Sequence, residues 1–402
     1  MGGVPMSALL DFAEGTTSTY LNGPMGLVME AVKNTYWFGR LIQGQRSKKK
    51  MISGGANIRQ SIVFQDSASL ETYLPGAPHA WNNPQRLKKL QAEWRYTMAH
   101  MSWIEQEILN NEIVQYGDDE ARFCEFVNIR NEKEAICWAS IWNGLENLLW
   151  QVPFSADMES ADGTEPYSIE AFINEDTSGL FNPRTTPSTT WSTIETVDPT
   201  AAGITPKFTP QQGTYSSAVA TGAGSENNII SSMDNMAELL TFEQPPTMAQ
   251  YWEDPRYNKQ MIVTTRRGRA IYKQLLRAGQ DHFVAGPQDP AYPDPQYYGI
   301  PIQRASTLEG LALYRNNAGT GLLDEFTDAG GTAGRGPRFY FLNAEYLFPV
   351  FHARRYFYKY DVTKDHNVPD TWVLPIAVWY NLVCTSRQRQ GILSPSSSVY
   401  TS

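Results

Sequence analysis

Residues 57–65 read NIRQSIVFQ, and residues 90–101 read LQAEWRYTMAHM. Apolar and polar residues alternate in both segments, which is the pattern of β-strands that bury one face. We therefore predict that the segments form the two arms of an antiparallel hairpin. A hairpin with this much unpaired edge is marginally stable alone, so we expect it to lie on a neighbouring molecule. The residues that share a face are Ile58, Ile62 and Phe64 in the first arm and Trp94, Tyr96 and Met98 in the second.

The tip between the two arms, residues 66–84, is long and apolar for a turn. It contains Tyr73, Leu74 and Trp81 among several prolines. A connection of this length without secondary structure of its own is usually functional. We therefore expect the tip to make contacts and not simply to face solvent.

A helical spacing follows the hairpin. We predict helix from Ser102 onward, with Asp118 as a capping residue, and ending at Trp150. In its second half the apolar residues recur at positions i, i+3, i+4, i+7 and i+11, which is the core-facing stripe of an amphipathic helix. Those residues are Trp138, Ile141, Trp142, Leu145 and Leu149.

The rest of the chain alternates short strands with helices. Residues 151–224 are rich in Thr, Ser, Pro and Gly, and we predict short irregular strands for them. A helix candidate at 22–42 precedes the basic residues Arg46 to Lys50. This order indicates an α+β or mixed α/β fold. Further helices are predicted at 225–240 and 266–278, and strands at 261–264, 300–302, 339–342, 356–358 and 373–384.

Composition excludes some classes of protein and leaves others open. The net charge of −9 argues against a surface made entirely to hold nucleic acid, although a local basic patch remains open. The 11 Trp, 21 Tyr and 17 Phe suit both interfaces and carbohydrate-binding sites, so they do not choose between them. Cys124, Cys137 and Cys384 form no CxxC pair and are expected to be buried, reduced thiols. No apolar run is long enough to span a bilayer, and the N-terminus lacks the basic region of a secretory signal.

No set of residues in the sequence has the spacing of a known catalytic site. The five histidines show no zinc-binding spacing, and the glycine-rich loop 330–336 lacks the Lys and Ser/Thr of a phosphate-binding loop. Acidic pairs such as Asp118 and Asp119 are explained equally well by capping and solvated faces. We therefore expect no enzyme and no cofactor.

The order of these parts resembles the major capsid protein of tailed bacteriophages, which has the Hong Kong 97-type fold. The likeness covers nearly the whole chain, from a basic N-terminal arm through a projecting hairpin and a long helix to a β-rich return. The segments that carry it are IRQSIVFQ (58–65), EWRYTMAHMSWIEQEILNN (93–111), MIVTTRRGRAIYKQLLR (261–277), YYGIPIQRAS (297–306) and PIAVWYNLVCTSRQRQGIL (375–393).

The resemblance implies an α+β fold in five parts. These are an N-terminal arm (1–50), an extended β-hairpin loop (51–101), a peripheral domain with a spine helix (102–154), an axial domain (155–350), and a return to the peripheral domain with a C-terminal tail (351–402).

It also implies a structural role. Copies of the chain would self-assemble, as hexamers and pentamers, into the icosahedral head shell that encloses double-stranded DNA, and assembly would take place in the host cytoplasm. The implied partners are other copies, a separate scaffolding protein, a portal, the packaged DNA through non-specific contact, and optionally a decoration protein, with no membrane.

Specific residues take roles under this resemblance. The inter-subunit contacts are Tyr73, Leu74, Trp81, Trp94 and Tyr96. The candidate hinges are Gly54, Gly55 and Gly117, and the candidate DNA-facing residues are Arg46, Lys48, Lys49 and Lys50. Two alternatives stay open: an aromatic-rich carbohydrate-active hydrolase, and another virion component such as a portal or tail protein.

Overall fold

The structure is a computed structural model of the chain. It describes residues 37–43, 51–63, 87–106, 112–115, 122–125, 129–151, 163–173, 193–201, 204, 207–215, 229–240, 260–279, 295–297, 299–309, 314–315, 322–323, 337–366, 368 and 370–395.

These residues belong to two compact units. The first draws on Thr97–Gly144 and Arg354–Val378, and the second on Asn34–Tyr96, Leu145–Ala353 and Trp379–Ser402. The boundary falls inside three long elements, which therefore contribute residues to both units: strand β4 (Arg95–Ile104), helix α4 (Ile129–Trp150) and strand β17 (Thr371–Cys384).

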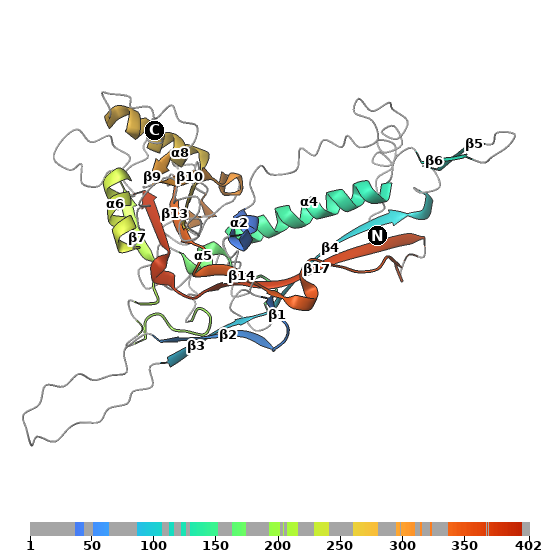
Figure 1. The fold of residues 1–402 in the computed structure, drawn as a ribbon, viewed down its shortest axis with the longest axis horizontal. Coiled ribbons are helices and arrows are strands. Elements are labelled where there is room, and N and C mark those ends of the chain that lie inside the picture. Colours follow the sequence, from blue (N-terminus) through green and yellow to red (C-terminus); the bar gives the residue numbers. More distant parts are fainter. Residues whose placement is uncertain are drawn as a thin grey trace, which may run out of the picture. The chain divides into compact units, whose positions relative to one another are not determined.

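The predicted hairpin is confirmed, with a shorter second arm. β2 (Asn57–Val63) pairs antiparallel with β3 (Leu87–Glu93) (Figure 1). The register sets Asn57 opposite Glu93. The chain then breaks at Trp94 and continues as β4 (Arg95–Ile104), whose partner is β17. The predicted return strand is therefore two strands with different partners.

The predicted long helix is confirmed over α4 and is wrong for residues 102–104, 112–115 and 122–125. The first of these end β4, and the others form the antiparallel pair β5 (Glu112–Gln115) and β6 (Arg122–Glu125). Short runs of β-branched and aromatic residues fit the helical period and the strand period equally well. In the sequence, Gly and Asp residues between 112–115 and 122–125 favour a turn. Cys124 consequently lies in a strand.

Strand β17 organises one sheet. In the second unit, β14 (Leu347–His352) pairs antiparallel with residues 380–384 of β17 and parallel with β1 (Met51–Ile52). In the first unit, β15 (Tyr358–Lys359) and β16 (Thr363–Lys364) pair antiparallel with the other end of β17. The predicted strand at 373–384 is thus confirmed.

The predicted strand at 356–358 is wrong for residues 356 and 357, and only Tyr358 lies in a strand, β15. Residues Ala353–Arg355 form a 3-10 turn, and Phe357 has a left-handed φ of 46°, which is unusual for a bulky residue. The Phe357 ring stacks on Trp142 at 5.2 Å between centroids and also contacts Trp138 at 6.0 Å. This packing on α4 holds the backbone in its turned conformation.

A second sheet, mixed in strand direction, lies wholly in the second unit. Its order is β7-β18-β13-β8-β10-β9, with parallel pairs β7/β18 and β8/β10. The helices α6 (Ile229–Leu239) and α8 (Arg266–Gly279) pack on it, and both predicted helices are confirmed. The strands are β7 (Gln211–Tyr215), β18 (Gly391–Pro395), β13 (Phe339–Asn343), β8 (Gln260–Thr264), β10 (Ile300–Arg304) and β9 (Gln296–Tyr297).

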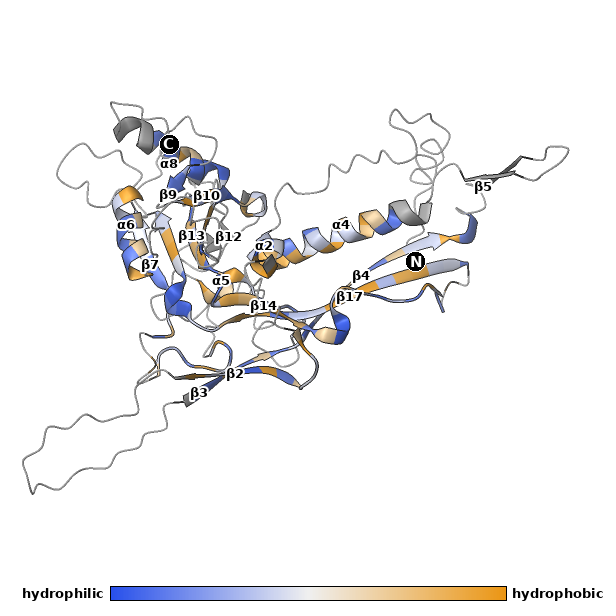
Figure 2. Ribbon diagram, in the orientation of Figure 1, coloured by the Kyte–Doolittle hydropathy of each residue, from blue (hydrophilic) through white to orange (hydrophobic). Residues whose placement is uncertain are grey.

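The core of the second unit lies against this sheet. Phe339 and Phe341 of β13 and Met233 and Met236 of α6 are almost fully buried in one cluster with Ile262 of β8. Figure 2 shows the hydrophobic residues along α6 and on the strands of this sheet. Short elements complete the described chain: α2 (Trp37–Gln43), α5 (Ile169–Phe172), β11 (Tyr314–Arg315), β12 (Leu322–Leu323), and the 3-10 turns Ser306–Glu309 and Arg387–Arg389.

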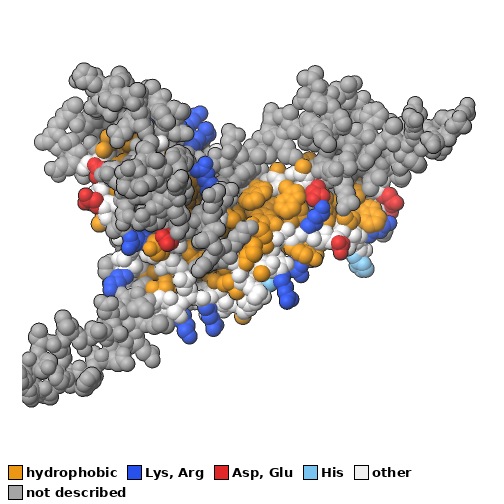
Figure 3. Space-filling view, in the orientation of Figure 1, with side chains coloured by type: hydrophobic (Ala, Val, Ile, Leu, Met, Phe, Trp, Pro, Cys, Tyr) orange, Lys and Arg blue, Asp and Glu red, His pale blue; other side chains and the backbone are white. Residues whose placement is uncertain are grey.

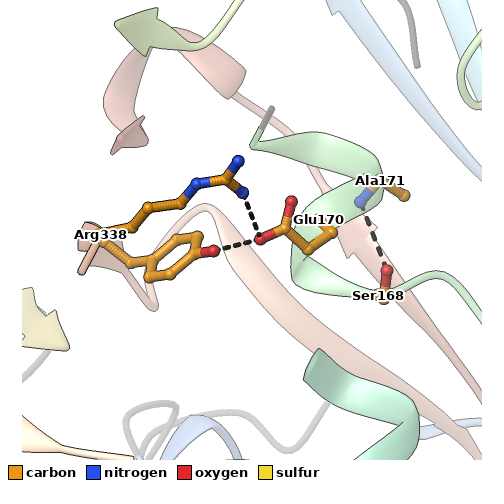
Figure 4. Close-up of polar contacts among 5 residues, drawn as sticks. Ser168, Glu170, Ala171 and Arg338 are labelled. Carbon is orange, nitrogen blue, oxygen red and sulfur yellow. Dashed lines mark hydrogen bonds and ion pairs between the residues drawn. The ribbon is translucent and has the colours of Figure 1, made fainter. Parts of the chain in front are cut away.

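A buried polar cluster joins α5 to β13. The Glu170 carboxylate accepts a hydrogen bond from the Tyr340 hydroxyl and lies 3.6 Å from the Arg338 guanidinium (Figure 4). Ser168 caps the N-terminus of α5, because its hydroxyl accepts a hydrogen bond from the Ala171 amide at 3.3 Å. The Arg338 and Glu170 side chains are only 6% and 3% exposed, so the pair is desolvated and the loss of either charge would leave the other without compensation.

Two helical glycines should respond oppositely to alanine. A Cβ at Gly144 of α4 would meet nothing within 4 Å, so Gly144→Ala should raise the free energy of unfolding by about 0.5–1 kcal/mol through helix propensity. A Cβ at Gly268 of α8 would collide with the Thr264 hydroxyl, which already donates to the Arg338 carbonyl, and would also press on Pro337. Overpacking of this kind costs about 1–3 kcal/mol and outweighs the propensity gain. Urea unfolding of both variants measures the difference, and equal shifts would contradict it.

Candidate assembly interface

The hairpin has one covered and one exposed face. Ile58, Leu90 and Ala92 are buried, with Ile58 opposite Ala92 in the register. Arg59 and Lys89 are exposed. The alternation predicted from the sequence therefore holds over residues 58–62 and 89–93.

Trp94 and Tyr96 stand at the two ends of a chain of aromatic rings. The Trp94 ring meets the His352 ring edge to face at 5.4 Å, His352 meets Trp379 at 5.4 Å, and Trp379 meets Tyr96 at 4.7 Å. Trp94 is 6% exposed, so its ring is covered by its own chain. Tyr96, at the other end of this row of rings, is 64% exposed to solvent.

The exposed face of β4 begins with two large apolar side chains, Tyr96 and Met98. Met98 lies two positions after Tyr96 and is 62% exposed, and His100 and Ser102 continue the same exposed alternation. Large exposed apolar side chains that gather on one face mark interaction sites. The predicted contact set omits Met98, although the alternation that selects Tyr96 selects it equally.

Polar contacts hold the root of the hairpin, which comprises residues 54–57 and 93–95. The Trp94 indole donates to the Gly55 carbonyl at 3.0 Å, and Gly55 has a left-handed φ of 102° that favours glycine. The Arg95 guanidinium donates to the Gly163 carbonyl. The Asn381 amide donates to the Glu93 carbonyl at 2.7 Å and accepts from the Tyr167 amide at 2.9 Å. Gly54 and Gly55 remain predicted hinges, and the chain beside them is held at several points.

Sequence reasoning missed Asn381, which a local signal could have revealed. It is fully buried in β17, inside the apolar run IAVWYNLVC. A polar residue within such a run must satisfy its amide internally, which points to a fixed structural contact.

The face of α4 in the first unit is also aromatic. Trp138 and Trp142 flank the strained Phe357, and the Lys359 ammonium forms an ion pair with Glu134 at 2.5 Å. Figure 3 shows hydrophobic side chains gathered over α4. The helix therefore offers a half-buried aromatic surface and not a uniformly polar one.

The remaining predicted site residues lie outside the described residues. These are Tyr73, Leu74, Trp81, Gly117, Arg46, Lys48, Lys49 and Lys50. Of the predicted set, Gly54, Gly55, Trp94 and Tyr96 are described, and they are brought together at the root of the hairpin and the start of β4.

Within the described part of the chain, no group of three or more His, Cys, Asp or Glu side chains is placed to hold a metal ion. Among the same residues, no helix is both long and apolar enough to cross a membrane. Cys137 and Cys384 are buried free thiols, and burial raises the pKa of each above its ordinary value.

No protein-family model and no curated protein sequence matches the chain. Solved structures do. The chain is similar to the cyanophage A-1(L) capsid asymmetric unit, with a TM-score of 0.52 and 11% identity over 92% of this chain and 96% of that one. It is also similar to the capsid of the native GTA particle, with a TM-score of 0.50 and 10% identity over 94% and 95%. The capsid of the empty GTA particle gives a TM-score of 0.50 and 10% identity over 95% of both chains.

These likenesses extend over nearly the full length of both partners, so they concern the whole architecture and not a shared motif. They confirm the resemblance drawn from the order of parts in the sequence. This chain has the α+β fold of phage major capsid proteins.

Proposed function

We propose that the chain is a major capsid protein, which self-assembles into the icosahedral head shell enclosing the double-stranded DNA genome of a tailed phage. The observation that carries this proposal is the likeness to capsid structures over 92% and 94% of the chain. Its role is structural and not catalytic, and its place is the virion after assembly in the host cytoplasm.

The proposed mechanism is mechanical. The extended loop, residues 51–101, would lie over the α4 helix of an adjacent subunit and bring Tyr73, Leu74 and Trp81 against it. The exposed Tyr96 supports a contact here, because its ring is held by Trp379 and loses little conformational freedom on binding. Trp94 would contribute by holding the loop root, since its ring is already covered.

The other parts take the roles that this fold suggests. Residues 1–50 would form an arm whose Arg46, Lys48, Lys49 and Lys50 face the packaged DNA. Residues 102–154 and 351–402 would form the peripheral domain and 155–350 the axial domain around five-fold and six-fold centres. Gly54, Gly55 and Gly117 would let one chain serve both centres. A separate scaffolding protein and a portal would take part in assembly, with a decoration protein as an optional addition.

Electron microscopy of the full chain, expressed alone and together with its scaffolding protein, tests this function. We expect closed shells, or hexamers and pentamers as separate species. A carbohydrate-active hydrolase predicts monodisperse monomers in both preparations, and that result would overturn the proposal. Rings of a single symmetry that never close would instead favour a portal or tail component.

A further inference from the structure

The turn from Ile194 to Val197 has an unfavourable backbone. Ile194 and Val197 exchange hydrogen bonds of 2.9 and 3.0 Å, and the two residues between them have positive φ, 51° for Glu195 and 64° for Thr196. Glycine and asparagine suit such a turn, whereas Glu and the β-branched Thr do not. A conformation of this kind persists when surrounding contacts hold it.

The contacts that hold the turn come from two distant segments. The Glu195 carbonyl accepts a hydrogen bond from the Gln91 amide of β3 at 3.0 Å. Its carboxylate accepts one from the Cys384 amide, at the end of β17, at 3.1 Å. Glu195 is fully buried, and so is Arg387, whose guanidinium donates to the carbonyls of Phe172 and Phe208.

The charges of Glu195 and Arg387 interact. Burial lowers the pKa of Arg387 to about 10, while Cys384 and Glu195 act in the opposite direction. The Glu195 carboxylate is therefore held by the backbone amide at the end of β17, and the carbonyl of the same residue binds the hairpin. One strained residue thus connects the hairpin to the core of the second unit.

We propose that the Glu195 turn is a latch for the β2–β3 hairpin. In the docked state the Gln91 amide is bonded to the strained turn. In the released state that bond is broken and the turn relaxes, so the strain offsets part of the cost of release. The hairpin root can then change orientation without loss of the core. The use of two orientations, one for each symmetry environment of a shell, rests on the proposed function, whereas the latch itself rests on the geometry above.

Hydrogen exchange of the unassembled full chain, followed by mass spectrometry, tests the latch. Thr196→Gly removes the β-carbon penalty without touching the buried charge, so exchange in residues 87–93 should slow about 5-fold. Glu195→Gln keeps an oxygen for the Cys384 amide but removes the negative charge that interacts with the buried Arg387, and the same segment should exchange about 10-fold faster. Residues 339–343 of β13 report on the core and should not change in either variant.

Three outcomes would overturn the latch. They are unchanged exchange of residues 87–93 in Thr196→Gly, faster exchange there in that variant, and an equal change in residues 339–343. If Glu195→Gln fails to fold, Thr196→Gly decides alone. Exchange is measured before assembly, so a chain that forms no shell leaves this test intact. Normal shells with unaltered exchange would remove the latch and keep the proposed function.

Discussion

Glu170→Ala should lower the free energy of unfolding of the second unit by about 3–5 kcal/mol. The carboxylate lies 3.6 Å from the Arg338 guanidinium, and both side chains are almost completely covered. The substitution leaves the Arg338 charge buried without its carboxylate partner. It also removes the acceptor of the Tyr340 hydroxyl, and Tyr340 is only 1% exposed. Trp150 lies 5.4 Å from the Tyr340 ring, so tryptophan fluorescence during urea unfolding reports on this region.

An exposed ion pair supplies the matched control. Lys359 and Glu134 are 37% and 23% exposed, and pairs screened by water are worth about 0–1 kcal/mol. Glu134→Ala should therefore change stability little. The double variant Glu170→Met with Arg338→Met removes both buried charges together and should recover most of the loss. A single variant at Glu170 that costs no more than Glu134→Ala would show that the buried pair does not stabilise the unit.

The hairpin and α4 could be predicted from sequence because their signals are local. Ile58 and Ile62 mark a two-residue period, and Trp138, Trp142 and Leu149 mark a helical one. The segment that includes Trp103 and Ile104 carried an equally plausible helical spacing, yet it is a strand. The reason lies far away in the chain, because β4 pairs with β17 and a tertiary partner outweighs a weak local preference.

Strands β7 and β18 show the same limit. They read QQGTY and GILSP, with glycine in both and a proline in one, and such residues usually weaken a strand. They form because each pairs with the other in parallel, and β18 also pairs with β13. Neither segment contains a local signal that predicts its pairing with a strand about 180 residues away.

The residues of the candidate interface were also only partly predictable from the sequence. The alternation placed Trp94 and Tyr96 on one face, yet Tyr96 is highly exposed and Trp94 is covered. The break between β3 and β4 falls at Trp94, so the alternation does not continue through it. Glu195 carries no sequence signal, because its importance arises from Gln91, Cys384 and Arg387, which lie in two other parts of the chain.

Replacing residues 66–84 with a short glycine and asparagine turn should abolish shell assembly and leave a folded, soluble subunit. The paired strands end at Val63 and Leu87, which lie opposite each other, so a short connection can close the hairpin without altering its register. The replacement removes Tyr73, Leu74 and Trp81, and buried anchors of this kind are each worth about 2 kcal/mol or more at an interface. Sedimentation and electron microscopy measure assembly, and hydrogen exchange of residues 57–63 verifies the hairpin.

A second variant separates the length of the loop from its chemistry. Serine at Tyr73, Leu74 and Trp81 keeps every residue of the tip and removes its large apolar side chains. If apolar contact with a neighbouring copy drives assembly, this variant should fail as the shortened chain does, because each contact is repeated at every subunit of a shell. Shells of normal size from the shortened chain would contradict the role assigned to the tip. Shells from the serine variant alone would show that the reach of the loop matters and that these three side chains do not.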